Sequence, residues 1–120
     1  MKSYLNQRIR SFSHAFNGLW ILIKEEHHAR IHLLATVIVI FTGFYVGLAS
    51  YDWLMVCLAI GLVFSFELIN TAVERLGDVV SKDPHPLIKK AKDLSAAAVL
   101  VSAMAALIVG VLVFYKYLWP

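Results

Sequence analysis

The sequence predicts an all-α integral membrane protein with three transmembrane helices and an N-terminal amphipathic helix on the membrane surface. Of its 120 residues, 60% are hydrophobic and 16% are charged, whereas soluble domains have about 45–50% apolar and about 25% charged residues. The apolar residues form long uncharged runs, and a chain of this size has too much surface to bury them in a soluble globule. Residues 1–120 are therefore expected to form one membrane domain.

Residues 5–28, ahead of the first span, are expected to form a helix in the cytoplasmic interface. Its apolar residues recur at helical spacing, with polar residues opposite: Phe12, Phe16, Leu19, Trp20 and Ile23. The segment is too short and too polar to cross a bilayer, so a helix that lies in the plane of the interface fits it better. From this pattern alone, a simple membrane anchor is the favoured function.

Three apolar segments are long enough to cross a membrane, at residues 31–51, 53–76 and 93–116. The first has 21 residues without a charge, which cover about 31 Å at 1.5 Å per residue, the thickness of a hydrocarbon core. A short polar turn separates it from the second span. Two prolines, Pro84 and Pro86, interrupt the loop before the third span, and the next helix is expected to start near Leu87.

The distribution of charge sets the orientation and excludes one class of partner. Of the 11 Lys and Arg residues, five precede the first span, five lie between the second and third, and only Lys116 follows the third. Because cytoplasmic loops carry the excess of basic residues, the N-terminus and the loop are placed in the cytoplasm and the C-terminus outside. The net charge of +3, without a basic stripe, gives no indication of nucleic-acid binding.

The most informative feature is a polar face within the second span. Glu67 and Glu74 are seven residues apart, so they lie within about 20° of each other around a helix. Three further polar residues flank the same face: Asn70, Thr71 and Asp78. A charge at the centre of a membrane helix costs about 2.5–3.5 kcal/mol on insertion scales, so an intramembrane acid indicates function by default. Glu67 lies about 10.5 Å deeper in the membrane than Glu74. At that depth only a lipid group or a small translocated ion would meet it, whereas Glu74 lies at the headgroup level.

Simpler structural explanations exist for parts of this face and for the start of the third span. Glu74 and Asp78 could form a solvated helix end, and Glu67 could be a protonated packing residue. Lys92 and Asp93 lie level with the cytoplasmic end of the acidic face. A lysine there could hold a phosphate, and the aspartate could orient it, although lysines that border a span are usually topology signals.

Glu26, just ahead of the first span, has two candidate roles. It is spaced for an i,i+4 ion pair with Arg30, or it could complete a divalent-metal site with Glu74. Mg²⁺ takes few protein carboxylates and relies on substrate phosphates for its other ligands. His28 and His32 are one helical turn apart, but the spacing places no third ligand beside them, so the sequence does not predict a zinc site.

Together these motifs resemble the prokaryotic diacylglycerol kinase family, which includes the undecaprenol kinases of many bacteria. The resemblance rests on ELINTAVE at residues 67–74, Asp78, the HPL sequence at 85–87 and the AKD sequence at 91–93, and it extends from about Phe12 to Val113. It implies a homotrimer in the bacterial inner membrane that transfers the γ-phosphate of MgATP to a lipid alcohol, at a site built between subunits.

The resemblance also implies roles for individual residues. Glu67 would be the general base for the lipid hydroxyl, with Asn70 and Ala96 beside the lipid. Glu26 and Glu74 would bind Mg²⁺. The residues implied to contact ATP are His14, Glu26, Glu74, Asp78, Asp83, Pro84, His85, Lys92 and Asp93.

Two of these positions depart from the family pattern. His14 stands where the family can place an aromatic residue against the nucleotide. Ala96 stands where proteobacterial members have a serine, and Ser95 comes one place earlier. The sequences of the HPL loop and of the NTAVE stretch are more similar to the undecaprenol-kinase branch of the family. A polyprenol is therefore the expected acceptor, and diacylglycerol is the other possibility.

A channel and a scaffold are the alternatives to an enzyme. A small oligomeric ion or proton channel lined by Glu67 and Asn70 would need those residues but not Lys92, Asp93 or a metal. A scaffold peptide that regulates another membrane protein would need no buried acid. Neither GxxxxGK[ST] nor GxGxxG occurs in the chain, so phosphate binding would depend on the carboxylates and a lysine.

Overall fold

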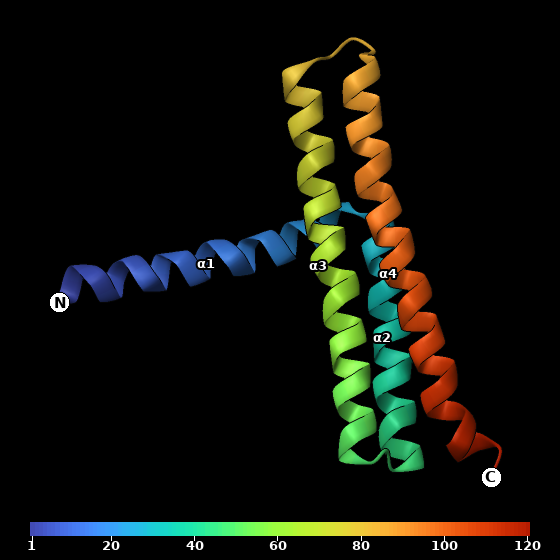
Figure 1. Cartoon of the computed structure of the whole chain (residues 1–120). Coiled ribbons are helices and arrows are strands. Elements are labelled where there is room, and N and C mark those ends of the chain that lie inside the picture. Colours follow the sequence, from blue (N-terminus) through green and yellow to red (C-terminus); the bar gives the residue numbers. More distant parts are fainter.

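The computed structural model describes all 120 residues, as four helices with short connections (Figure 1). The helices are α1 (Lys2–Glu25), α2 (His27–Val46), α3 (Ser50–Val80) and α4 (Pro86–Leu118). The last three are each long and apolar enough to cross a membrane, which confirms the three predicted spans.

The helices form a narrow bundle with one arm. α3 and α4 make a long antiparallel hairpin, and α2 lies along the half of the bundle away from the hairpin tip (Figure 1). α1 leaves the bundle at a steep angle where α2 begins, and the hairpin tip projects past that level (Figure 1). One extended residue, Glu26, with φ −104° and ψ 117°, separates α1 from α2 and allows the change of direction. The resulting body measures 54 × 47 × 21 Å.

The helices do not end where the predicted membrane spans end. An apolar run predicts which residues lie in the hydrocarbon layer, whereas helical hydrogen bonding can continue beyond that layer. α3 continues in helical form to Val80, and α4 already begins at Pro86, close to the expected Leu87. Proline suits the first helical position because its missing N–H has no partner there in any case. His85 caps this end, since its Nδ1 accepts a hydrogen bond from the backbone N–H of Leu87 at 3.2 Å.

α2 ends at Val46, five residues before the predicted end of the first span. Gly47 adopts the left-handed conformation with φ 71°, which favours glycine and stops the helix. The backbone N–H groups of Gly47 and Leu48 both donate to the carbonyl of Gly43, at 3.1 and 3.0 Å. The turn into α3 is therefore only three residues long.

A polar cluster fastens the far end of the bundle. Asp52, near the start of α3, is 3% exposed. Its carboxylate accepts from Lys116 Nζ at 2.7 Å and from the Tyr117 hydroxyl at 2.6 Å, both near the end of α4. The Tyr117 oxygen in turn accepts from the Ala49 backbone N–H at 3.0 Å. These contacts join the α2–α3 turn to the end of α4.

The single chain buries few side chains. Only 11 of the 120 residues are buried, and large apolar side chains are exposed along all four helices. In α1 the exposed set includes Phe12, Phe16 and Trp20. Such an outside surface is compatible with lipid or neighbouring protein, and incompatible with water alone.

Candidate active site

At the cytoplasmic end predicted from charge, Lys92 of α4 meets two acids of α3. Its Nζ lies 2.5 Å from Asp78 Oδ1 and 3.6 Å from Glu74 Oε2. The side chain reaches them by crossing Gly77, where an added Cβ would lie 2.9 Å from Lys92 Cε. Glu74 and Asp78 thus lie on the face that the sequence predicted, and Gly77 leaves room for the Lys92 side chain to reach them. We call these three charged groups the rim cluster.

The neighbouring Asp93 points elsewhere. Its Oδ2 is 2.6 Å from Lys89 Nζ, one turn earlier on the same helix, and both side chains are exposed. The structure therefore separates Lys92 from Asp93, which the sequence treats as a pair.

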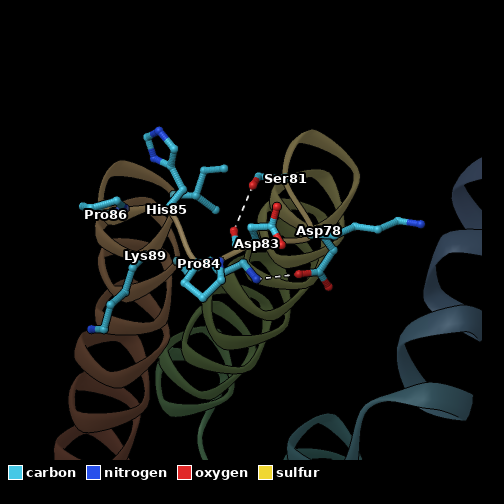
Figure 2. A pocket seen from close by; sticks show the side chains of 10 residues that line it. Asp78, Ser81, Asp83, Pro84, His85, Pro86 and Lys89 are labelled. Atoms are coloured by element: carbon cyan, nitrogen blue, oxygen red, sulfur yellow. Dashed lines mark hydrogen bonds and ion pairs between the residues drawn. The ribbon is translucent and has the colours of Figure 1, made fainter.

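A cavity of about 540 Å³ lies at the hairpin tip, beside the rim cluster (Figure 2). Asp78 comes from α3, Lys89 from α4, and the loop between the two helices supplies most of the rest (Figure 2). Five of the residues implied to contact a nucleotide line it: Asp78, Asp83, Pro84, His85 and Lys92. His14 is exposed on α1 and is not among the lining residues.

Arg75 connects α3 to the junction of α1 and α2. Its guanidinium pairs with Glu25 and lies 3.7 Å from Glu26 Oε1. Of the two candidate roles for Glu26, the ion pair with Arg30 does not form, since Arg30 instead donates to the backbone carbonyl of Lys24 at 3.2 Å. The reason is the break at Glu26, because an i,i+4 pair needs both residues within one continuous helix.

Glu26 and Glu74 have the donor chemistry that Mg²⁺ requires. Both supply carboxylate oxygens, and Mg²⁺ characteristically combines one or two such ligands with water and substrate phosphates. Nowhere in the chain do three His, Cys, Asp or Glu side chains converge in a metal-binding group. The two carboxylates face Arg75 and Lys92 respectively, so the residues fit a metal that arrives together with phosphate.

Deeper in the bundle, Glu67 is buried, with its side chain 4% exposed. His32 of α2 brings Nε2 to 3.1 Å from Glu67 Oε1. The two atoms are close enough for a hydrogen bond, but the imidazole N–H does not point at the carboxylate oxygen. No other group donates to this buried oxygen. The buried carboxylate therefore has an oxygen toward which no aligned donor is directed.

Asn70, one turn from Glu67 toward the rim, also faces α4. Its Oδ1 accepts from the Ser95 hydroxyl at 2.8 Å. Ala96, implied by the resemblance to lie beside the lipid, is exposed and carries no polar side-chain atom. Ser95 and His32 are the polar partners of the deep site that sequence reasoning did not select.

Comparison with known proteins identifies the class to which this bundle belongs, the membrane lipid kinases. A family model described as prokaryotic diacylglycerol kinase matches residues 13–114, and the chain belongs to that family. The chain is 40% identical over 113 residues to the undecaprenol kinase of Bacillus subtilis (strain 168), covering 94% of this chain and 92% of that protein.

Two diacylglycerol kinases are also similar. That of Synechocystis sp. is 38% identical over 101 residues, covering 83% of this chain and 58% of its own length. That of Escherichia coli (strain K12) is 25% identical over 111 residues, covering 92% and 88%. The protein is a lipid kinase, and the resemblance noted from the motifs is confirmed.

Proposed function

We propose that the protein transfers the γ-phosphate of MgATP to the hydroxyl of a membrane lipid alcohol. The observation that carries the proposal is that Glu67 is buried within the bundle, while the two acids of the rim cluster, Glu74 and Asp78, stand on the same helix and meet Lys92 of α4. Glu74 and Asp78 lie about 10.5 and 16.5 Å from Glu67 along the axis. A hydrophobic alcohol and a water-soluble nucleotide can both approach such a site.

The proposed chemistry assigns a role to each end of the site. Glu67 accepts the proton of the lipid hydroxyl, whose oxygen then forms the new bond to the γ-phosphorus. The bond from this phosphorus to the bridging oxygen breaks, and its electron pair leaves with ADP. Phosphoryl transfer depends mainly on positioning and charge neutralisation. Lys92 supplies a cation at the rim, where the nucleotide phosphates compete with Glu74 and Asp78 for it.

Glu26 and Glu74 are the residues proposed to hold Mg²⁺. The ion would neutralise charge on the nucleotide phosphates, which is its general contribution to phosphoryl transfer. Arg75 keeps Glu26 close to α3, so that both carboxylates remain near the cytoplasmic end of the bundle.

The proposed setting is a homotrimer in the bacterial inner membrane, with α1 in the cytoplasmic interface and the C-terminus outside. The concentration of Lys and Arg on one side supports the orientation. The exposed apolar side chains of α1 and its steep angle to the bundle support a surface location (Figure 1). The trimer rests on family membership and places further residues of the site on neighbouring subunits.

Undecaprenol is the acceptor we propose, with diacylglycerol second. This choice is supported by the relative from Bacillus subtilis, which is named an undecaprenol kinase and matches nearly the whole chain. The HPL and NTAVE sequences support it as well.

The test is phosphorylation of each alcohol by the purified protein in lipid vesicles with MgATP. We expect transfer to undecaprenol to be the faster reaction, and we expect Glu67→Gln to abolish it. Glu25→Gln is the matched control, because Glu25 makes an exposed ion pair that is worth little. Failure of well-folded protein to phosphorylate any lipid alcohol would refute the proposal, and equal activity of Glu67→Gln would refute the role of Glu67.

A further inference from the structure

We propose that His32 is a positioning residue for Glu67, holding its carboxylate in the orientation that accepts the hydroxyl proton. This inference rests on the function proposed above and adds a residue to the same site. His32 lies on α2 and Glu67 on α3, so the contact joins two separate spans. The distance between His32 Nε2 and Glu67 Oε1 is 3.1 Å.

The surroundings of Glu67 make this contact important. Its side chain is 4% exposed, and Oε1 receives no aligned hydrogen bond from the chain. A buried polar oxygen without a partner is costly, and the imidazole N–H is the donor within reach. Catalytic hydrogen bonds are often poorly aligned before substrates bind and tighten in the reacting complex. A modest rotation of the His32 ring would give the N–H of Nε2 that alignment.

His32 is also unlike the other histidines of its helix. Its side chain is only 27% exposed. His27 and His28 are instead exposed and face each other, with their ring centroids 6.1 Å apart. His32 further borders an apolar cavity of about 600 Å³ between α2, α3 and α4. The ring therefore stands between an apolar space and the acid. With Oε1 engaged by His32, Oε2 remains as the oxygen for the incoming hydroxyl.

The experiment compares three full-length variants with the unaltered protein in vesicles, with the concentrations of ATP and of the alcohol varied in turn. We expect His32→Ala to lower kcat by about 10²-fold, since misplacing a reacting group by 1 Å has an effect of this size, while KM for ATP and for the alcohol change little. His32→Gln places an amide nitrogen three bonds from Cβ, as in histidine, and should retain most of the activity. His28→Ala is the matched control and should behave as the unaltered protein.

A second measurement follows the contact without turnover. In protein labelled with ¹⁵N in the histidine rings, Glu67→Gln should shift the His32 Nε2 resonance and leave that of His14 unchanged. The proposal is overturned if His32→Ala keeps the kcat of the unaltered protein, if the Gln variant is as impaired as the Ala variant, or if the resonance does not move. If His32→Ala does not fold, the Gln variant and the resonance still decide. Absence of phosphotransfer in the unaltered protein would instead refute the kinase chemistry.

Discussion

The hydroxyl of Ser95 lies 2.8 Å from Asn70 Oδ1 and 2.9 Å from the backbone carbonyl of Lys92. One hydroxyl proton can serve only one of these acceptors at a time. Ser95 therefore couples the deep part of the site, through Asn70, to the helical turn that carries Lys92. This connection between the deep part of the site and the rim cluster runs entirely within the hairpin of α3 and α4.

Ser95→Ala should remove a fixed partner of Asn70. A neutral hydrogen bond contributes about 1 kcal/mol, equivalent to about 5-fold in a rate or equilibrium constant. We expect kcat/KM for the lipid alcohol to fall about 3–10-fold, with KM for ATP nearly unchanged. Ser65→Ala is the matched control, because Ser65 bonds only to the carbonyl of Gly61 in its own helix. An unchanged kcat/KM in steady-state assays would remove Ser95 from the site.

Gly77→Ala should displace Lys92 without unfolding the hairpin. The added Cβ would lie 2.9 Å from Lys92 Cε and 3.1 Å from Ile88 Cγ2. The flexible end of the lysine can move aside, but only by leaving Glu74 and Asp78. We expect KM for ATP to rise about tenfold, which corresponds to about 1.4 kcal/mol.

Gly61→Ala, on the same helix, is the control for Gly77→Ala, because an added Cβ there meets nothing within 4 Å. Its KM for ATP should match that of the unaltered protein. Equal KM values for both glycine variants would show that Lys92 does not need the space over Gly77.

Glu74→Gln should raise the Mg²⁺ concentration that gives half-maximal activity. Loss of a group that only orients a metal ligand already costs 10–100-fold in affinity, so for a proposed ligand we expect a shift of about tenfold or more. The measurement is a magnesium titration at fixed ATP, with Glu25→Gln alongside. An unchanged titration curve would exclude Glu74 as a ligand, while leaving Glu67 and Lys92 in their roles.

Tyr117→Phe should weaken the far end of the bundle and spare catalysis. It removes one of the two donors to buried Asp52 and leaves the Ala49 N–H without its acceptor. A hydrogen bond to a charged group contributes about 1.5–3 kcal/mol. We expect thermal inactivation in a fixed detergent to occur several degrees lower, with normal turnover at low temperature. Tyr115→Phe is the control, since Tyr115 is exposed; equal inactivation temperatures would contradict the role of the Tyr117 hydroxyl.

The sequence was sufficient for the number of spans and for the polar face of α3, because both follow from strong one-dimensional patterns. Long apolar runs indicate membrane-spanning helices, and the seven-residue spacing of Glu67 and Glu74 fixes their common face. Helix ends were less predictable. α4 starts at Pro86, beside the expected Leu87, because prolines mark the loop, whereas α2 ends at Val46 rather than 51 because Gly47 takes the left-handed conformation.

The periodicity of the sequence did not predict which side chains make contacts between different helices. Arg75 pairs with Glu25 and Glu26, fifty residues away along the chain, and no periodicity within one helix encodes this. His32 reaches Glu67 for the same reason, through the packing of α2 on α3. Ser95, next to the position selected by family resemblance, shows that a shift of one residue turns a side chain by about 100° around a helix.

The scarcity of buried residues, 11 of 120, has a practical meaning for handling this protein. In a water-soluble protein the interior is mostly shielded from the buffer, whereas here the surrounding amphiphile touches most side chains directly. Detergent chain length and bilayer thickness therefore act on helix tilt and spacing as directly as a mutation would. The medium used to extract this protein therefore influences the arrangement of its helices.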